Sequence, residues 1–257
     1  MLSKVNYNKI SESYDNRYLT SPLEGVQSEL QKLIDRFNPK LILEIGSGTG
    51  HWMSKINGEG RSVLGVDYST GMLLEAKRNH HIQNLMCADA QLLPIKEKTL
   101  DFIYCINAIH HFTNPYGFMV NAKYTLRPGG VFTIMGLDPA EPANEWFLWK
   151  YFPGTYEYDL NRYTSFEKLE DQMTEIGFQD IIIKDVHRVS YTMINEEVLN
   201  DNFIEKSQSS QLTVLSYSEY EAGIKMIHDE IAYAKSEGIK LAFKVNLLFK
   251  SITATAS

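Results

Sequence analysis

The sequence lacks several features that would define its function at once. It has only two cysteines, Cys87 and Cys105, and both lie in apolar strand-like runs. We therefore expect reduced core residues and no disulfide or metal site. No apolar run approaches the roughly 20 residues that a membrane span needs, and the N-terminal stretch has no apolar core of signal-peptide length. These absences make a cytoplasmic protein without a membrane span the default expectation.

Positive charge is also scarce. The 257 residues carry 25 Lys and Arg against 32 Asp and Glu, a formal net charge of −7. A nucleic-acid binder normally carries a basic surface, so we expect no nucleic-acid partner, although local basic patches are compatible with this composition. The hydrophobic content of 44% is ordinary for a globular chain long enough to bury a sizeable core.

Strand-like and helix-like runs alternate regularly over residues 40–137. Strands are predicted at 41–44, 61–67, 84–88, 99–106 and 131–135, and helices at 21–37, 51–56, 69–80 and 116–126. This order implies βαβ crossovers and a mostly parallel α/β sheet, doubly wound and covered on both faces. A capping box of Ser21 and Glu24 is expected to open the first helix.

The pattern changes after residue 137. The segment 138–163 is rich in Trp, Tyr and Pro and has no clear period. A capping box at 164–167 opens a helix that Gly177 ends, and strands follow at 178–186 and 239–249. The stretch 195–238 between these strands is predicted to be helical, with a capping box of Ser218 and Glu221. The two irregular stretches are interpreted as insertions over the sheet.

A glycine-rich loop follows the first strand, in the sequence Glu44-Ile-Gly46-Ser47-Gly48-Thr-Gly50. Glycine lets the backbone turn sharply and lets a ligand approach without meeting a Cβ atom. The dinucleotide fingerprint G-x-G-x-x-G is not matched, and no Lys-Ser/Thr pair follows as in phosphate loops. An acidic residue before the glycines would repel a pyrophosphate and attract a cationic ligand.

Polar residues stand at the ends of four successive strands. They are Glu44, Asp67, Asp89 and Asn107, in chain order. In open α/β sheets ligands bind beyond the carboxyl ends of the strands, near the switch point of the strand order. We therefore expect these side chains to border one ligand site.

The ordered set of these motifs, with the Leu-Arg-Pro-Gly-Gly turn at 126–130, resembles class I S-adenosylmethionine-dependent methyltransferases of the small-molecule type, the methyltransferase type 11 group. The resemblance is close over residues 40–137 and looser over 1–39 and 164–190. It implies a Rossmann-like fold with seven strands and S-adenosylmethionine as cofactor. It also implies a single domain over 1–257: a lid arm and helix at 1–39, a cofactor-binding core at 40–137, and cap insertions at 138–163 and 195–238.

The resemblance assigns cofactor contacts position by position. Glu44 would hold the amino group of the methionine part, Asp67 the ribose hydroxyls and Asp89 the exocyclic amine of adenine. Tyr68 and Met72 would pack on the adenine ring, unless they are plain core residues. The remaining contacts implied are Tyr14 in the arm, Gly46, Ser47, Gly48 and Gly50 in the loop, Ala90, and Asn107.

Histidines at 110 and 111 are the candidate catalytic groups. Methyl transfer is an in-line displacement that needs an aligned nucleophile and, for a hydroxyl, a base. Histidine suits proton removal near neutrality, and paired histidines here are similar to those of small-molecule O-methyltransferases. His111 or His110 is therefore proposed as the base, although one of the pair could simply pack at a helix start.

Aromatic side chains are dense in the predicted arm and cap. In the family the stretch after residue 138 covers the acceptor pocket, so we expect a wall for a small aromatic or amphipathic acceptor. The candidate substrate contacts are Tyr18, Trp146, Trp149, Tyr156, Tyr158 and Arg162. A partner-binding amphipathic helix is the competing interpretation of this stretch.

Several alternatives stay open from the sequence. A methyltransferase fold could retain its cofactor pocket without catalysis, or act on RNA or protein, although the Asn107-Ala-Ile run lacks the Asn/Asp-Pro-Pro-aromatic motif of the enzymes that methylate amino groups. An NAD-linked oxidoreductase is the remaining enzyme alternative. The sequence does not decide among O-, N- and C-methylation, and it is compatible with a homodimer without fixing an oligomeric state.

Overall fold

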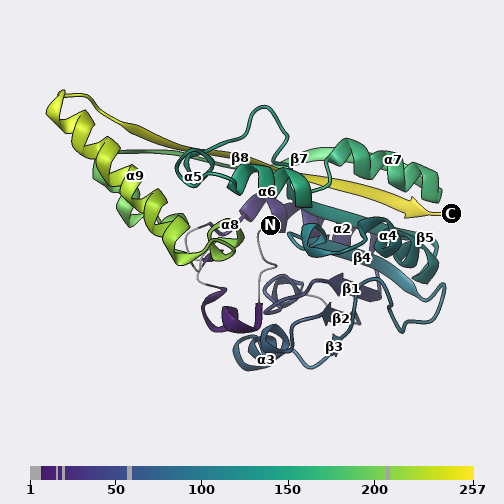
Figure 1. Cartoon of the computed structure of the whole chain (residues 1–257). Helices are drawn as coiled ribbons and strands as arrows, with labels where there is room; N and C mark the ends of the chain where they lie inside the picture. The colour runs from purple at the N-terminus through teal and green to yellow at the C-terminus, as the bar shows by residue number, and fades with distance from the viewer. Residues whose placement is uncertain (1–6, 16, 19–20, 57–59, 207–208) are drawn as a thin grey trace.

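The computed structural model describes residues 7–15, 17–18, 21–56, 60–206 and 209–257. The described residues form one mixed sheet with helices packed around it (Figure 1). The chain order of the α/β alternation confirms the predicted Rossmann-like class. No helix in these ranges is long and apolar enough to cross a bilayer.

Five parallel strands form the first part of the sheet, in the order β3-β2-β1-β4-β5. Their bounds are β1 Leu41–Ile45, β2 Ser62–Asp67, β3 Leu85–Cys87, β4 Leu100–Ile106 and β5 Leu126–Leu137. The order runs outward in opposite directions from β1 and β4, so the crevice between their carboxyl ends is the switch point. The connecting helices are α2 Glu24–Phe37, α3 Thr70–Asn79, α4 Pro115–Thr125 and α7 Phe166–Ile176.

Strand β8 (Ala242–Ala256) is antiparallel and joins the parallel strands to the rest of the sheet. It pairs with β5, with the two-residue β6 (Glu145–Trp146) and with β7 (Phe178–Ile194). The predicted seven strands are thus present, with short β6 as an eighth. Both β7 and β8 are longer than predicted, because each satisfies the backbone of the other from Phe178 opposite Ala256 to Ile194 opposite Ala242.

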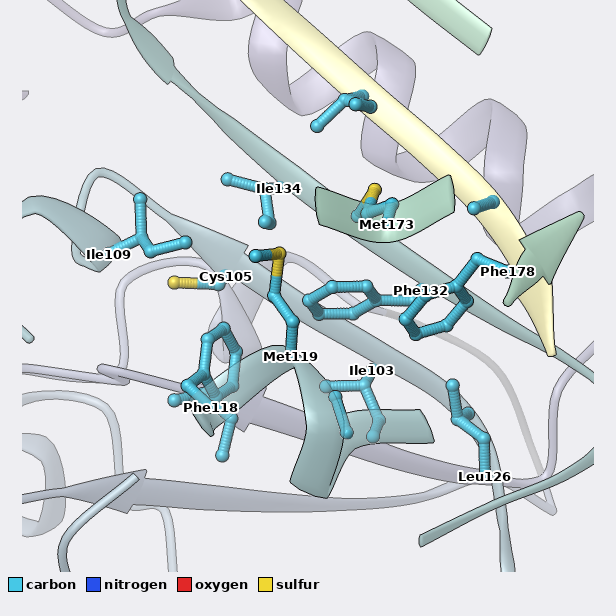
Figure 2. Close-up of a cluster of buried hydrophobic side chains, with 14 of the residues drawn as sticks. Ile103, Cys105, Ile109, Phe118, Met119, Leu126, Phe132, Ile134, Met173 and Phe178 are labelled. Atoms are coloured by element: carbon cyan, nitrogen blue, oxygen red, sulfur yellow. The ribbon is translucent and has the colours of Figure 1, made fainter. Parts of the chain in front are cut away.

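Both faces of the central strands are covered by helices. In β4, Ile103 and Cys105 face an apolar cluster with α4 and α7, and Figure 2 shows these side chains meeting Phe118 and Phe132. The alternate residues Phe102, Tyr104 and Ile106 belong to a second cluster with α2. An uninterrupted apolar strand is what a parallel strand buried on both faces requires.

The two segments predicted as insertions pack together on the far part of the β7–β8 pair. Their helices are α5 Phe147–Tyr151, α6 Thr155–Arg162, α8 Ser210–Thr213 and the long α9 Tyr217–Ser236. Phe147, Leu148 and Phe152 from the first segment share an apolar cluster with Ile227 and Ile231 from the second. Figure 1 shows α9 running alongside this part of the sheet. We call this part, residues 138–163 and 195–238, the cap.

Short 3₁₀ helices complete the described chain. They are η1 Tyr7–Lys9, η2 Ser11–Ser13, η3 Met53–Lys55, η4 Ile109–His111, η5 Asn195–Asn200 and η6 Asn202–Ile204. The helix predicted at 51–56 is thus only the single turn η3. The N-terminal arm, described from Tyr7 apart from positions 16, 19 and 20, contacts α3 through η1 and η2.

Three local predictions were wrong. Helix α2 starts at Glu24 with apolar Leu23 at the N-cap, so no Ser21–Glu24 capping box opens it. The capping box of α9 is Ser216 with Glu219, because the same Ser-x-x-Glu spacing occurs two residues before the predicted pair. Cys87 is exposed, since β3 is the edge of the sheet, whereas Cys105 is buried as predicted.

Candidate functional site

A cavity of about 1330 Å³ opens at the carboxyl ends of β1, β2, β3 and β4. Its walls come from the strand-end loops, the N-terminal arm, and the segment from α6 to the start of α7. Pockets for one small ligand usually measure roughly 300–1,000 Å³. The volume therefore accommodates two ligands side by side.

The glycine loop forms one wall, and its glycines are needed for different reasons. Gly46 has φ +70°, and a Cβ there would lie 2.3 Å from Cβ of Ala108. Gly48 has φ +53°, lines the cavity, and has no atom within 4 Å of an added Cβ, so its backbone faces open space. Gly50 instead packs against Ile82, in the loop after α3, and does not line the cavity. Ser47 lines the cavity with Gly46 and Gly48.

Asp67 ends β2 and is fixed in place by backbone amides. Its Oδ2 accepts from the Gly48 N–H at 2.8 Å, and its Oδ1 accepts from the Ser69 N–H at 2.8 Å. Burial raises the pKa of this carboxyl. Each carboxylate oxygen has a second lone pair, so Asp67 can still accept from a ligand in the cavity.

The other strand ends contribute as the sequence predicts. Asp89 lines the cavity and accepts from the Gln91 N–H at 2.9 Å. Asn107 follows β4 in a left-handed conformation with φ +51° and also lines it. The remaining predicted residues found in the same lining are Tyr68, which is 81% exposed, Met72 and Ala90.

Glu44 lies beneath the loop and not on the cavity wall. Its side chain is 1% exposed, and the Tyr104 hydroxyl donates to Oε2 at 2.8 Å. The other oxygen, Oε1, is buried and accepts no hydrogen bond of good geometry, although the Met53 backbone approaches the carboxyl. Burial raises the pKa of this carboxyl well above its usual range. Glu44 thus holds spare acceptor capacity next to the glycine loop.

The histidine pair lies on η4, directly after β4, and lines the cavity. The Tyr7 hydroxyl from the arm is 2.5 Å from Nε2 of His111, and the His110 ring stacks on Tyr163 at 4.0 Å. Burial lowers the pKa of both imidazoles well below its usual value, and the guanidiniums of Arg162 and Arg17 lower it further. Both histidines are therefore neutral at pH 7.

The arm is held over the cavity by polar contacts to two walls. Asp15 contacts the Thr49 hydroxyl and lies 3.0 Å from Nε2 of His80. The Asn8 Oδ1 accepts from the Gly71 N–H at 2.8 Å. Asn8 was not among the predicted site residues, and no sequence motif marks it. Predicted Tyr14 and Tyr18 both line the cavity, and Tyr18 stacks on His51 at 3.7 Å.

The predicted substrate residues of the cap divide into two groups. Tyr158 and Arg162 line the cavity. Trp146 is buried in the apolar cluster of the cap, and Trp149 donates from Nε1 to Asp159 at 3.0 Å while it packs against Tyr156. Neither tryptophan nor Tyr156 lines the cavity. The density of aromatic residues in the sequence therefore does not predict which of them line the pocket and which pack in the core behind it.

The comparison with protein families matches the same part of the chain. Residues 43–134, from β1 to β5, match the model described as a methyltransferase domain. This match agrees with the predicted resemblance to class I S-adenosylmethionine-dependent methyltransferases. The matched segment contains the glycine loop, Asp67, Asp89 and the histidine pair.

Curated relatives share this methyltransferase domain over part of their length. The biotin biosynthesis bifunctional protein BioHC of Cellvibrio japonicus is 24% identical over 204 residues, which are 76% of this chain and 40% of that protein. A tRNA U34 carboxymethyltransferase of Pseudoalteromonas atlantica is 29% identical over 113 residues, 42% of this chain and 33% of that enzyme. The chain thus spans less than half the length of these relatives.

Solved structures share the fold over most of the chain. A methyltransferase from an antibiotic biosynthesis pathway of Anabaena variabilis aligns with a TM-score of 0.64 at 17% identity, covering 89% of this chain and 96% of that one. Phosphoethanolamine N-methyltransferase 2 of Haemonchus contortus, solved in complex with S-adenosyl-L-methionine, aligns with a TM-score of 0.54 at 21% identity, covering 89% of this chain and 52% of that one.

The site fits S-adenosylmethionine, the cofactor that the sequence resemblance implies, on three observations. The Gly48 backbone presents a surface that no Cβ obstructs. Asp67 is oriented by two amides with acceptor capacity to spare. Glu44 has a buried oxygen that accepts no hydrogen bond of good geometry.

Proposed function

We propose that this protein transfers a methyl group from S-adenosylmethionine to a small-molecule acceptor bound against the arm and cap. One observation carries the proposal: a single cavity contains both the strand-end acids of the methyltransferase domain and the buried Tyr7–His111 pair. Its volume leaves room for an acceptor beside the cofactor.

The chain's own residues would hold the cofactor at the strand ends. Asp67 would accept the ribose hydroxyls, and Asp89 would accept from the exocyclic amine of adenine. Met72 and Tyr68 would pack on the adenine ring. Gly46, Ser47, Gly48 and Asn107 would contact the methionine part, and Glu44, which is not on the cavity wall, would reach its amino group through water. When bound, the cofactor supplies a methyl group activated by its sulfonium for in-line transfer.

His111 would act as the base when the nucleophile is a hydroxyl. Its neutral imidazole can accept a proton at Nε2, and the Tyr7 hydroxyl already lies at that nitrogen. Burial raises the pKa of Tyr7 well above its usual range, so the phenol keeps its proton for donation. A proton from the acceptor can thus reach Nε2 through the Tyr7 oxygen. The stack of His110 on Tyr163 supports the neighbouring ring, which assigns His110 to packing.

The cap and the core would fold as one domain. The apolar clusters of the cap and of the core both draw on β8, which pairs with β5 at one end and with β6 at the other. No boundary between the two parts is visible in the sheet of the described residues. The cap would then form a fixed wall of the acceptor site.

The proposal is tested by methyl transfer from labelled S-adenosylmethionine into a metabolite extract. We expect label in a low-molecular-weight product, and less of it with the Asp67→Asn variant at the same cofactor concentration. Cofactor binding by calorimetry without transfer to any fraction would indicate a non-catalytic binding module. Label in the RNA fraction would instead favour an activity on RNA, as the name of the Pseudoalteromonas relative suggests.

A further inference from the structure

Arg162, the last residue of α6, lines the acceptor end of the cavity with its side chain only 9% exposed. Its Nε and Nη2 donate to Oδ1 of Asp159 at 3.1 and 2.9 Å, and Nη2 also donates to the Ser210 hydroxyl at 2.6 Å. The third nitrogen, Nη1, is buried and has no hydrogen-bond partner. Two N–H donors of a buried cation are thus left for a ligand.

Hydrogen bonds to a buried carboxylate fix the orientation of Arg162. Asp159 is fully buried and also accepts from Nε1 of Trp149 at 3.0 Å and from Nε2 of Gln211 at 3.0 and 3.1 Å. The carboxylate is therefore shared among several donors and held from both segments of the cap. Side chains locked in this way keep the guanidinium in one position before any ligand arrives.

Two arginines approach this end of the cavity. The guanidinium of Arg17 lies 3.7 Å from the centre of the Tyr14 ring, and both Arg17 and Arg162 act on the histidine pair. Asp159 is the carboxylate paired with Arg162, whereas Asp67 and Asp89 lie at the strand ends. Asp138 also lines the cavity, but its carboxylate accepts from the backbone N–H groups of Ala140 and Phe166. The unused donors of the buried Arg162 guanidinium favour an anionic ligand.

We propose that the methyl acceptor carries a carboxylate or phosphate group, which Nη1 of Arg162 binds. The inference rests on the proposed function and adds the chemical class of its substrate. Planar guanidinium donors match the oxygens of both groups. Tyr158 and Tyr163 belong to the same lining, and their hydroxyls would supply further donors to the oxyanion. The apolar faces of these rings accommodate the rest of the molecule.

The experiment is calorimetry on the protein loaded with S-adenosylhomocysteine, using three probes that share one ring: benzoate, phenyl phosphate and benzyl alcohol. We expect wild type to bind one of the anions at least 10-fold more tightly than the neutral alcohol, and the preferred anion identifies carboxylate or phosphate. The Arg162→Gln variant should lose this preference, and Arg162→Lys should retain part of it. Arg188→Gln, at an exposed arginine of β7, is the matched control and should bind as wild type.

A second variant separates ligand binding from folding, because Arg162→Gln leaves the Asp159 carboxylate buried without its cation. Arg162→Met combined with Asp159→Asn removes both charges and should also lose the preference while binding S-adenosylhomocysteine as wild type does. Equal affinity of wild type for charged and neutral probes, or a preference that persists in Arg162→Gln, would overturn the inference.

The inference and the proposed function fail in different ways. Methyl transfer to an acceptor without an anionic group would overturn the inference and leave the function standing. An oxyanion preference that depends on Arg162, in a protein that transfers no methyl group to any fraction, would support the anion site and overturn the function.

Discussion

The hydroxyl of Tyr7 and Nε2 of His111 lie 2.5 Å apart, although 104 positions separate them in the chain. This contact joins the N-terminal arm to the end of β4 and buries the imidazole beneath the arm. The candidate base therefore exists in its buried, neutral form only while the arm is in place.

Replacement of His111 tests its role as base. We expect His111→Ala to lower kcat by roughly 100- to 10,000-fold, the range for loss of general base catalysis, while the affinity for S-adenosylhomocysteine stays within about twofold. Tyr7→Phe removes only the hydroxyl and should lower kcat less. Measured kcat values for both variants decide the assignment, and unchanged turnover in His111→Ala would remove it.

The pH dependence of kcat/KM follows from the same burial. Because the pKa of His111 lies well below its usual value, the imidazole is already neutral at pH 6.5 and stays so above it. Activity should therefore fall only as the pH drops through this lowered pKa, which protonates Nε2. A profile that falls between pH 7.5 and 6.5 would show that another group is the base.

Asp67 is expected to determine cofactor affinity. Asp67→Asn removes the charge and places an amide N–H₂ against one of the two backbone donors, Gly48 or Ser69. A hydrogen bond to a charged group contributes about 1.5–3 kcal/mol, so the Kd for S-adenosylhomocysteine should rise roughly 10- to 100-fold. Asp201→Asn is the control, because Asp201 also accepts from a backbone N–H but lies outside the cavity lining. Calorimetry on both variants provides the comparison.

Alanine at Gly48 tests whether a ligand approaches the loop closely. Gly48 and Gly129 both have positive φ and no atom within 4 Å of an added Cβ. Each replacement should therefore lower stability by the same roughly 1–2 kcal/mol that a left-handed residue costs, as measured by urea denaturation. Only Gly48→Ala should weaken binding of S-adenosylhomocysteine, since Gly129 is not in the lining. Equal binding by the two variants would contradict close approach at Gly48.

His51 should make the protein sensitive to acid. Burial is the largest cause that lowers its pKa from 6.5 to about 4. The unfolded chain therefore binds this proton first, so stability is lost as the pH falls from about 6.5 to about 4 and levels off below that. His51→Phe retains an aromatic ring against Tyr18 and should lose less stability over this interval. His228→Phe, at an exposed position, should follow wild type in urea titrations at pH 7, 5.5 and 4.

Local sequence patterns predicted the strands and strand-end residues of the first half of the molecule well. The five parallel strands alternate with helices as the apolar runs indicate, and Asp67, Asp89 and Asn107 meet at one cavity because parallel strands end on the same edge. The Gly177 end of α7 is also as predicted, whereas its N-cap is Ser165 and not Thr164 of the predicted capping box. Each of these features depends on residues close together in the sequence.

The second half depends on contacts between distant residues. Trp149 and Arg162 occur in the same aromatic stretch and donate to different oxygens of Asp159, yet only Arg162 lines the cavity. Nothing in the spacing of these residues separates them. The same holds for the length of β7, whose residues beyond Val186 pair with β8, a partner far away in the sequence.

The placement of β8 also bears on the order in which the chain can fold. This strand is the last to leave the ribosome among those described, yet it lies between β5 and β7 and carries β6 as well. Until it is made, β5 has an open edge and β7 has no partner in the described sheet. The nascent protein therefore exposes unpaired strand edges until β8 is made, and the sheet can be completed only when β8 inserts between β5 and β7.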